Sequence, residues 1–305
     1  MGIIRAVMAG HRHSLLACLA CTVWLAGCSA LPAPNGATPS PPPTPTATPQ
    51  PIVALVNGEG ILQADYEAEL ARFEAAQAAL GIDLATLEGY QGRVLQALIE
   101  RRLLAQGAAA EGVSVREEAV LAETQNLALD LGSTDALEGW MAENNYTLES
   151  LIRGLREEML AAEMVARLAE AVPADAEQVH ARHILMPSRE EAEVLRDEVL
   201  VGGDFAELAE AFSLDLSTRP AGGDLGWFPQ GYLTTPEVEQ MAFSLEPGEI
   251  GEVVESRLGF HIVQTIEREV RPLLPDALER LQEGAVESWL AERRQASAIE
   301  ILIAP

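Results

Sequence analysis

"HARHIL", residues 180–185, places two histidines in a short segment that otherwise has the apolar side chains of a buried β-strand. The chain has five histidines. Two of them lie in an N-terminal leader, and the other three are His180, His183 and His261. His261 has a similar setting, "LGFHIVQ" at residues 258–264. A chain this poor in histidine therefore concentrates it on two predicted strands.

The two faces of the first strand are predicted to differ. Side chains alternate along a strand, so His180 and His183 point to opposite sides. His183 shares its face with Ala181 and Leu185, which we expect to be the row that faces the core. His180 lies in the other row with Ile184 and is predicted to be a bystander. The H-x-x-H spacing suits a zinc site on a helix better than one on a strand, and no cysteine lies nearby, so no metal site is predicted.

A buried imidazole needs partners for both ring nitrogens, because each unsatisfied group costs about 1–3 kcal/mol. One solution pairs His183 with His261 on a neighbouring strand, with complementary tautomers. The other is two separate core histidines with backbone partners. The pattern alone leaves both open.

The first 28 residues indicate a bacterial lipoprotein signal. Arg5 and Arg12 precede the apolar run "LLACLACTVWLAG", and "LAGC" ends at Cys28 and resembles a lipobox. We expect cleavage before Cys28 and acylation of its thiol, for instance by palmitate, which would anchor the chain to a membrane outside the cytoplasm. The alternative is an uncleaved transmembrane helix, but the apolar run is shorter than the ~20 residues that a span needs.

Charge and cysteine content exclude several classes of function. The formal net charge is −27 and the chain has no lysine, so its surface repels phosphate backbones and no nucleic-acid partner is expected. The acidity is explained by solubility, or alternatively by a preference for basic client proteins. Cleavage would remove Cys18 and Cys21, so their spacing indicates neither redox nor zinc chemistry.

Composition divides the chain into segments. The segment 31–51 contains nine prolines among Thr, Ala and Ser and is predicted to be an extended spacer. An Asn-Gly turn, apolar stripes at helical spacing and a break at Val172-Pro173 follow it. The predicted divisions are a signal peptide at 1–27, a lipidated linker at 28–51, a helical domain at 52–174, a strand-rich domain at 175–270 and a C-terminal helix at 271–305.

Several separated motifs resemble a parvulin-type (PpiC) peptidyl-prolyl isomerase domain. They are "ARHILM", "GGDFAELAEAFSLD", "AGGDLGWF" and "MAFSLEPGEIGEVVESRLGFHIVQ", and the match runs over residues 179–268 nearly without gaps. The lipobox, the start "VNGEGILQADY" of the helical region and the C-terminal helix are similar to extracytoplasmic foldases of the SurA and PrsA kind. The resemblance implies an α+β fold. A small antiparallel sheet flanked by helices would lie between an N-terminal helical chaperone domain and a C-terminal helix that packs back on it.

The resemblance also implies which residues act. It pairs His183 with His261 beside Asp215, and Ser256 matches a hydroxyl that steadies the histidine pair. The proline-ring pocket is expected at four apolar positions, Leu225, Leu233, Val238 and Phe243. Family members commonly carry Met and Phe at the positions of Leu233 and Val238, so the smaller side chains here predict a shallower pocket. No cofactor is expected.

Asp215 has three interpretations. An ionised carboxylate would repel the prolyl carbonyl oxygen, whereas a protonated one would donate a hydrogen bond to it. Without the resemblance, Asp215 in "SLDLSTRPAGG" is explained as an Asx residue that caps a turn. Gly222 and Gly223 also have two interpretations. They would let the loop fold back against the site, or serve as plain turn residues.

Two hypotheses on function follow. The first is a lipid-anchored prolyl isomerase and foldase, whose partners are unfolded or nascent secreted polypeptides that contain X-Pro bonds. The second is a holding chaperone with a catalytically weak or inactive parvulin domain. The presence of His183, His261 and Asp215 favours the enzyme.

Overall fold

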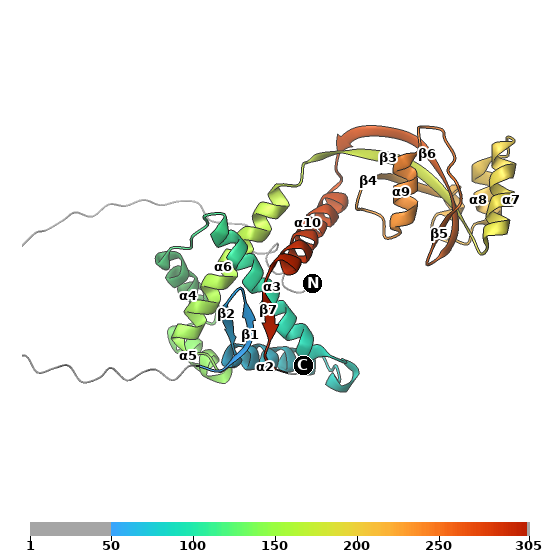
Figure 1. Cartoon of the computed structure of the whole chain (residues 1–305). Helices are drawn as coiled ribbons and strands as arrows, with labels where there is room; N and C mark the ends of the chain where they lie inside the picture. The colour runs from blue at the N-terminus through green and yellow to red at the C-terminus, as the bar shows by residue number, and fades with distance from the viewer. Residues whose placement is uncertain (1–49, 304–305) are drawn as a thin grey trace, which may run out of the picture. The chain divides into compact units, whose positions relative to one another are not determined.

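The structure is a computed structural model and describes residues 50–303 (Figure 1). Contacts divide the chain into two compact units, which are described separately. Of the described residues, the first unit contains 50–99, 121–153 and 298–303, and the second contains 100–120 and 154–297. The predicted signal peptide, Cys28 and nearly all of the proline-rich linker lie outside the described residues.

A three-stranded antiparallel sheet organises the first unit. Strands β1 (Ile52–Val56) and β2 (Glu59–Leu62) form a hairpin whose turn residues, Asn57 and Gly58, both have positive φ, 53° and 85°. This is the two-residue turn that an Asn-Gly pair predicts. Strand β7 (Ile299–Ile301) pairs with the other edge of β1, so that segments from the two ends of the described chain lie side by side (Figure 1).

Helices make up most of the rest of this unit. They are α2 (Gln63–Ala79), the short 3-10 helix η1 (Leu84–Thr86) and α5 (Thr134–Glu143), with parts of α3 (Tyr90–Ala110), α4 (Glu117–Asp130) and α6 (Leu148–Glu170), which continue into the second unit. The helical pattern predicted between residues 63 and 171 is confirmed. Buried side chains from the sheet and from three helices form the core: Val53, Val56, Ile61, Tyr66, Leu95, Leu98, Ile99 and Leu137.

The second unit contains the sheet that carries the histidines. Its strands are β3 (Asp175–Met186), β4 (Asp224–Pro229), β5 (Val254–Ser256) and β6 (Gly259–Pro272), in the order β4-β3-β6-β5. All neighbours are antiparallel. This small antiparallel sheet flanked by helices confirms the α+β prediction.

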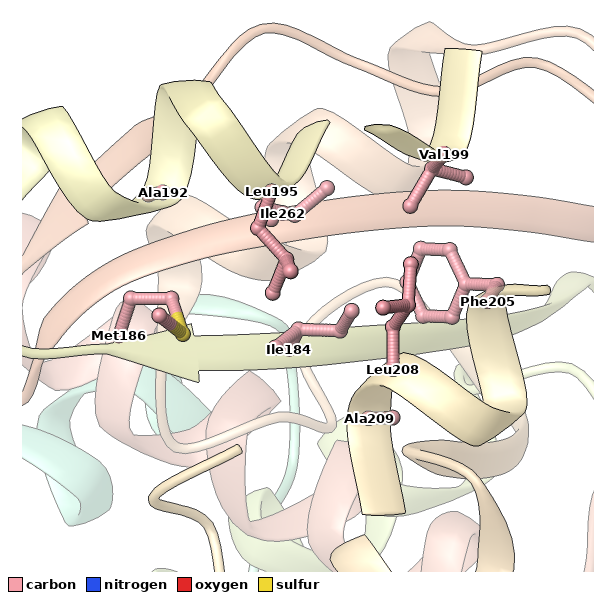
Figure 2. Close-up of a cluster of buried hydrophobic side chains, with 9 residues drawn as sticks. All are labelled: Ile184, Met186, Ala192, Leu195, Val199, Phe205, Leu208, Ala209 and Ile262. Carbon is pink, nitrogen blue, oxygen red and sulfur yellow. The ribbon is translucent and has the colours of Figure 1, made fainter. Parts of the chain in front are cut away.

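Helices α7 (Arg189–Leu200) and α8 (Phe205–Phe212) cover one face of this sheet. Figure 2 shows their apolar side chains converging on Ile184 and Met186 of β3 and on Ile262 of β6. Ile184 is completely buried. The prediction that only the row of His183 faces a core is therefore wrong, because helices cover the other row as well.

Helix α9 (Pro236–Ser244) covers the opposite face, on which His183 lies. The buried cluster here contains Val179, Ala181, Phe228, Val238, Ala242, Leu245 and Val263. Alternation along β3 explains the division, since Ala181 and Ile184 belong to different rows. The sheet thus has two thin cores, and the histidine row belongs to the one beneath α9.

The C-terminal helix α10 (Pro275–Ala296) packs on α3 and α6 within the second unit. Trp289 lies over Gly107, where a Cβ atom would come within 2.5 Å of the indole ring, so only glycine allows this approach. Gln282 donates a hydrogen bond to the carbonyl oxygen of Ala169 at 3.3 Å. The predicted returning helix is confirmed. Among residues 50–303, no helix is both long and apolar enough to cross a membrane.

Candidate active site

Strands β3 and β6 bring the two predicted histidines together. His183 pairs with Val263 and His261 with Leu185, which makes the two imidazoles diagonal neighbours on one face. Their rings stack with centroids 5.3 Å apart, and the two Nδ1 atoms are 3.1 Å apart. His183 is 6% exposed and His261 is 1% exposed. Of the two solutions left open by the sequence, the structure has the histidine pair.

The loop after α8 supplies the carboxylate. Ser213 fixes this loop to the end of β3, because its hydroxyl accepts a hydrogen bond from the Leu185 N–H at 3.1 Å. The Leu214 N–H donates to the Leu185 carbonyl oxygen at 2.8 Å. Asp215 therefore comes to lie beside the histidines, with its Oδ2 atom 2.8 Å from Nε2 of His183.

Two hydroxyl groups surround the Asp215 carboxylate. Ser217 donates to Oδ1 from its hydroxyl at 2.6 Å and from its N–H at 3.0 Å, and Thr218 donates to Oδ2 at 2.7 Å. Burial acts to raise the pKa of Asp215, but the hydrogen bonds from Ser217, Thr218 and His183 outweigh it and hold the pKa well below the ordinary value. The carboxylate is ionised at neutral pH, which decides between the two protonation states.

The backbone contact from Ser217 is also the Asx turn of the alternative interpretation. Asp215 caps its own turn through Oδ1 and contacts His183 through Oδ2. The Asp215 side chain therefore both caps a turn and lies in the site beside His183.

A one-way chain of hydrogen bonds fixes the tautomers. Because Asp215 is ionised, Nε2 of His183 must donate to it, and Nδ1 of His183 must accept from Nδ1 of His261. Nε2 of His261 then accepts from the Ser256 hydroxyl at 2.7 Å. The Ser256 oxygen accepts in turn from the Leu258 N–H at 3.0 Å. Each ring nitrogen has one partner of the right kind.

His261 is held in its neutral form. Burial and the neighbouring His183 lower its pKa from 6.5 to about 4, although the charges of Glu237 and Asp215 act in the opposite direction. A neutral ring is what the hydrogen-bond chain requires.

This shift predicts a loss of stability in mild acid. Between pH 6.5 and 4 the unfolded chain binds a proton on His261 that the folded chain does not, so the free energy of unfolding falls as the pH falls. We expect a loss of about 2 kcal/mol between pH 7 and pH 5. Urea unfolding at the two pH values measures it. The pKa of Asp215 lies below this window, so that carboxylate does not contribute.

His261→Gln is the control for the acid effect. Its own stability will differ from that of the wild type, but the loss between pH 7 and pH 5 should shrink by about 2 kcal/mol. Equal losses in the two proteins would contradict the prediction.

Three of the four predicted proline-pocket residues, Leu225, Leu233 and Val238, belong to or pack against the cluster beneath α9, on the face of the sheet that carries His183. Leu225 lies at a bulge in β4, between the residues that pair with Ala181 and Arg182, and is half-buried. Leu233 is half-buried against the same cluster, and Val238, at 2% exposure, belongs to it. The strand pairing thus places Leu225 beside residues 181 and 182 of β3, next to His183 in the sequence.

Phe243 lies elsewhere. Its ring meets Phe228 edge-on at 6.1 Å, and the Arg268 guanidinium lies 5.9 Å from its centre. Phe228 and Arg268 both pair with Val179, four residues before His183 on β3. The structure does not bring Phe243 to the histidine pair.

The paired glycines fold their loop against β3. The Gly223 carbonyl oxygen accepts a hydrogen bond from the His183 N–H at 2.9 Å. Gly223 has φ +81°, and a Cβ atom there would lie 2.1 Å from the His183 carbonyl oxygen. Both interpretations of these glycines are observed, because Gly222 ends the short 3-10 helix Arg219–Ala221 with φ 68° while Gly223 makes the close approach to His183.

His180 is outside the site. Its ring stacks on Trp227 at 5.5 Å, and Nε2 lies 2.8 Å from Oδ1 of Asp224. In the part of the chain that the structure describes, no group of three or more His, Cys, Asp or Glu residues could hold a metal ion.

Ser217 and Thr218 were not among the site residues predicted from the sequence. The signal was available in "DLST", because hydroxyl side chains two and three residues after an aspartate can donate to its carboxylate. The sequence prediction considered only a turn capped by Asp215 and no hydroxyl donors to its carboxylate.

Comparison with known proteins assigns both parts of the chain. Residues 161–267 match the family described as PPIC-type PPIase domain, and residues 35–165 match the family described as SurA-like N-terminal domain. These matches define the class: the chain is an enzyme, a peptidyl-prolyl cis-trans isomerase, with a SurA-like domain before its isomerase domain.

Within that class the chain is similar to proteins named as foldases and chaperones. Foldase protein PrsA of Caldanaerobacter subterraneus subsp. tengcongensis is 28% identical, over 82% of this chain and 82% of the relative. PrsA of Halalkalibacterium halodurans is 34% identical, over 68% of this chain and 65% of the relative. Chaperone SurA of Aromatoleum aromaticum is 39% identical, over 43% of this chain and 34% of the relative.

Proposed function

We propose that this isomerase speeds rotation about X-Pro bonds in unfolded extracytoplasmic polypeptides, through the array of Asp215, His183, His261 and Ser256. The observation that carries the proposal is the hydrogen-bonded histidine pair joined to an ionised carboxylate. The similarity to PrsA and SurA supports the role as a foldase outside the cytoplasm.

The chemistry requires no bond to break. Resonance gives the peptide C–N bond a rotation barrier of ~18–20 kcal/mol, and unaided X-Pro isomerisation takes tens to hundreds of seconds. The planar amide places negative charge on its carbonyl oxygen. A carboxylate close to that oxygen destabilises the planar form relative to the twisted one, while an apolar wall holds the proline ring.

Each residue has a distinct role in this proposal. Asp215 supplies the negative charge, and its bonds to Ser217 and Thr218 keep it ionised. His183 and His261 form a hydrogen-bonded floor, in which His261 is neutral and is held by Ser256. Leu225, Leu233 and Val238 line the place for the proline ring, and a contribution from Phe243 would have to be indirect.

The remaining expectations belong to the same proposal. Lipid on Cys28 would tether the chain to a membrane, with residues 28–51 as the spacer. The helical segment 52–174 would hold clients for the isomerase segment 175–270, with 271–305 packed back on the helices. The mechanism uses no metal and no cofactor.

A direct test follows the isomerisation of a tetrapeptide with one alanyl-prolyl bond. The full chain should accelerate it in proportion to protein concentration, and His183→Ala should remove most of the acceleration. A wild-type rate equal to the uncatalysed rate would refute the catalytic role of this site.

A holding chaperone is the second candidate function. Large apolar side chains are exposed on the first unit, among them Leu80 at 72% and Leu129 at 76%. If such side chains form a contiguous patch on this unit, it is a surface to which unfolded chains can bind. Aggregation suppression by His183→Ala at the wild-type level, together with lost peptide turnover, would show that the two functions are separate.

A further inference from the structure

The loop between β4 and α9, residues 230–235, carries one wall of the proposed proline site. Leu233 lies at its centre, half-buried against the cluster beneath α9. The loop has no regular secondary structure, and Gly231 in it has φ +86°. Something other than a strand or a helix must therefore fix the position of Leu233.

Glu239, in the first half of α9, provides this fixation. Its carboxylate accepts three hydrogen bonds from consecutive backbone N–H groups: from Gly231 at 2.7 Å, from Tyr232 at 3.0 Å and from Leu233 at 2.9 Å. The residue is only 8% exposed. Three N–H donors aimed at one carboxylate form a nest that binds a negative charge.

The loop amides are the hydrogen-bond donors to Glu239. Among the described residues, no Arg or His side chain forms an ion pair with it, and besides the favourable N-terminal end of α9 the three loop N–H groups satisfy the buried carboxylate. The dependence is mutual. If the loop moved away, a buried carboxylate would lose all its donors, so the loop is held in one arrangement.

We propose that Glu239 is the positioning residue of the proline site: by holding residues 231–233 it fixes the apolar wall at Leu233 and so sets the affinity for the proline ring. The inference rests on the proposed function. Glu239 acts through the loop and does not touch the reacting bond, so its loss should weaken substrate binding and leave the array around Asp215 intact.

The test compares Glu239→Gln with the wild type in the full chain. In glutamine, an NH2 group replaces one of the two carboxylate oxygens. This NH2 group then faces a backbone N–H donor of the loop, so at least one of the three hydrogen bonds becomes a repulsive contact. We expect the KM for an alanyl-prolyl tetrapeptide to rise about tenfold, with kcat within about threefold of the wild type, as expected when an interaction equal in ground and transition states is removed.

Glu252→Gln is the matched control, outside the loop and the site. It makes the same chemical change at an exposed glutamate whose carboxylate pairs with Arg196 at 2.9 Å, and it leaves the carboxylate nest unchanged. We expect its KM and kcat within about twofold of the wild type. Assays at 10 °C, with folding checked by circular dichroism, keep the comparison on folded protein.

Glu239→Asp keeps the charge on a shorter side chain and should give an intermediate KM. If the glutamine variant does not fold, the aspartate variant takes its place in the test. An unchanged KM in a folded glutamine or aspartate variant, or a fall in kcat alone, would overturn the inference. These outcomes leave wild-type turnover untouched, whereas an inactive wild-type chain would instead refute the proposed function.

Discussion

Asp215→Asn is expected to lower kcat/KM for an alanyl-prolyl peptide about a hundredfold. The variant keeps the size of the side chain and an oxygen that can accept from His183, but it removes the negative charge. Loss of one preorganised electrostatic group from an active site typically costs about 10²–10³ in rate. The measurement is the isomerisation rate over a series of enzyme concentrations at pH 7.5, where the wild-type carboxylate is ionised.

The chain contains a matched control for this substitution. Asp224 also contacts a histidine ring nitrogen at 2.8 Å, but its partner is His180, outside the site. Asp224→Asn makes the same chemical change and should leave kcat/KM within about twofold. If Asp215→Asn kept full activity, the charge would not be the working feature, and a hydrogen-bonding role would have to replace it.

Gly223→Ala is expected to destabilise the second unit by about 3 kcal/mol or more. The substitution forces a left-handed φ on alanine and drives its methyl group into the His183 carbonyl oxygen, 2.1 Å from the ideal Cβ position. The methyl carbon is bonded directly to the backbone and the oxygen is a backbone atom, so neither can move aside without disturbing β3. Urea unfolding followed by circular dichroism measures the change.

Gly226→Ala separates the clash from the backbone strain. Gly226 has φ +70°, similar to Gly223, but no atom lies within 4 Å of its Cβ position. Its alanine variant should cost only about 1–2 kcal/mol, the penalty of a left-handed conformation. Equal losses at the two glycines would mean that the close approach to His183 contributes nothing.

The isomerase fold was predicted from the resemblance of separated motifs to parvulin-type isomerases, whereas strands and turns follow from the pattern itself. "HARHIL" and "LGFHIVQ" indicate two strands with one histidine row, and the structure places them side by side as β3 and β6. The Asn-Gly turn likewise defines the hairpin of β1 and β2. These features are local or periodic, so a single sequence contains them.

Features that depend on packing were missed or misjudged. The burial of Ile184 depends on α7 and α8 covering the second face of the sheet, which alternation along β3 alone does not reveal. The nest around Glu239 joins residues six to eight positions apart through backbone N–H groups. Nearly every residue type has such a group, so the sequence does not reveal which of them bind the carboxylate. The protonation of Asp215 depends on the Ser217 and Thr218 hydroxyls, whose orientation only the folded loop determines.

The pairing of Ala54 with Ile301 affects the order in which a chain made from its N-terminus can fold. The edge of β1 that pairs with β7 cannot be completed until residue 301 has been made, whereas the sheet from 175 to 272 is complete some thirty residues earlier. Contacts between distant parts of a chain form slowly. The isomerase sheet should therefore fold first, and the first unit should close last, when its final strand arrives.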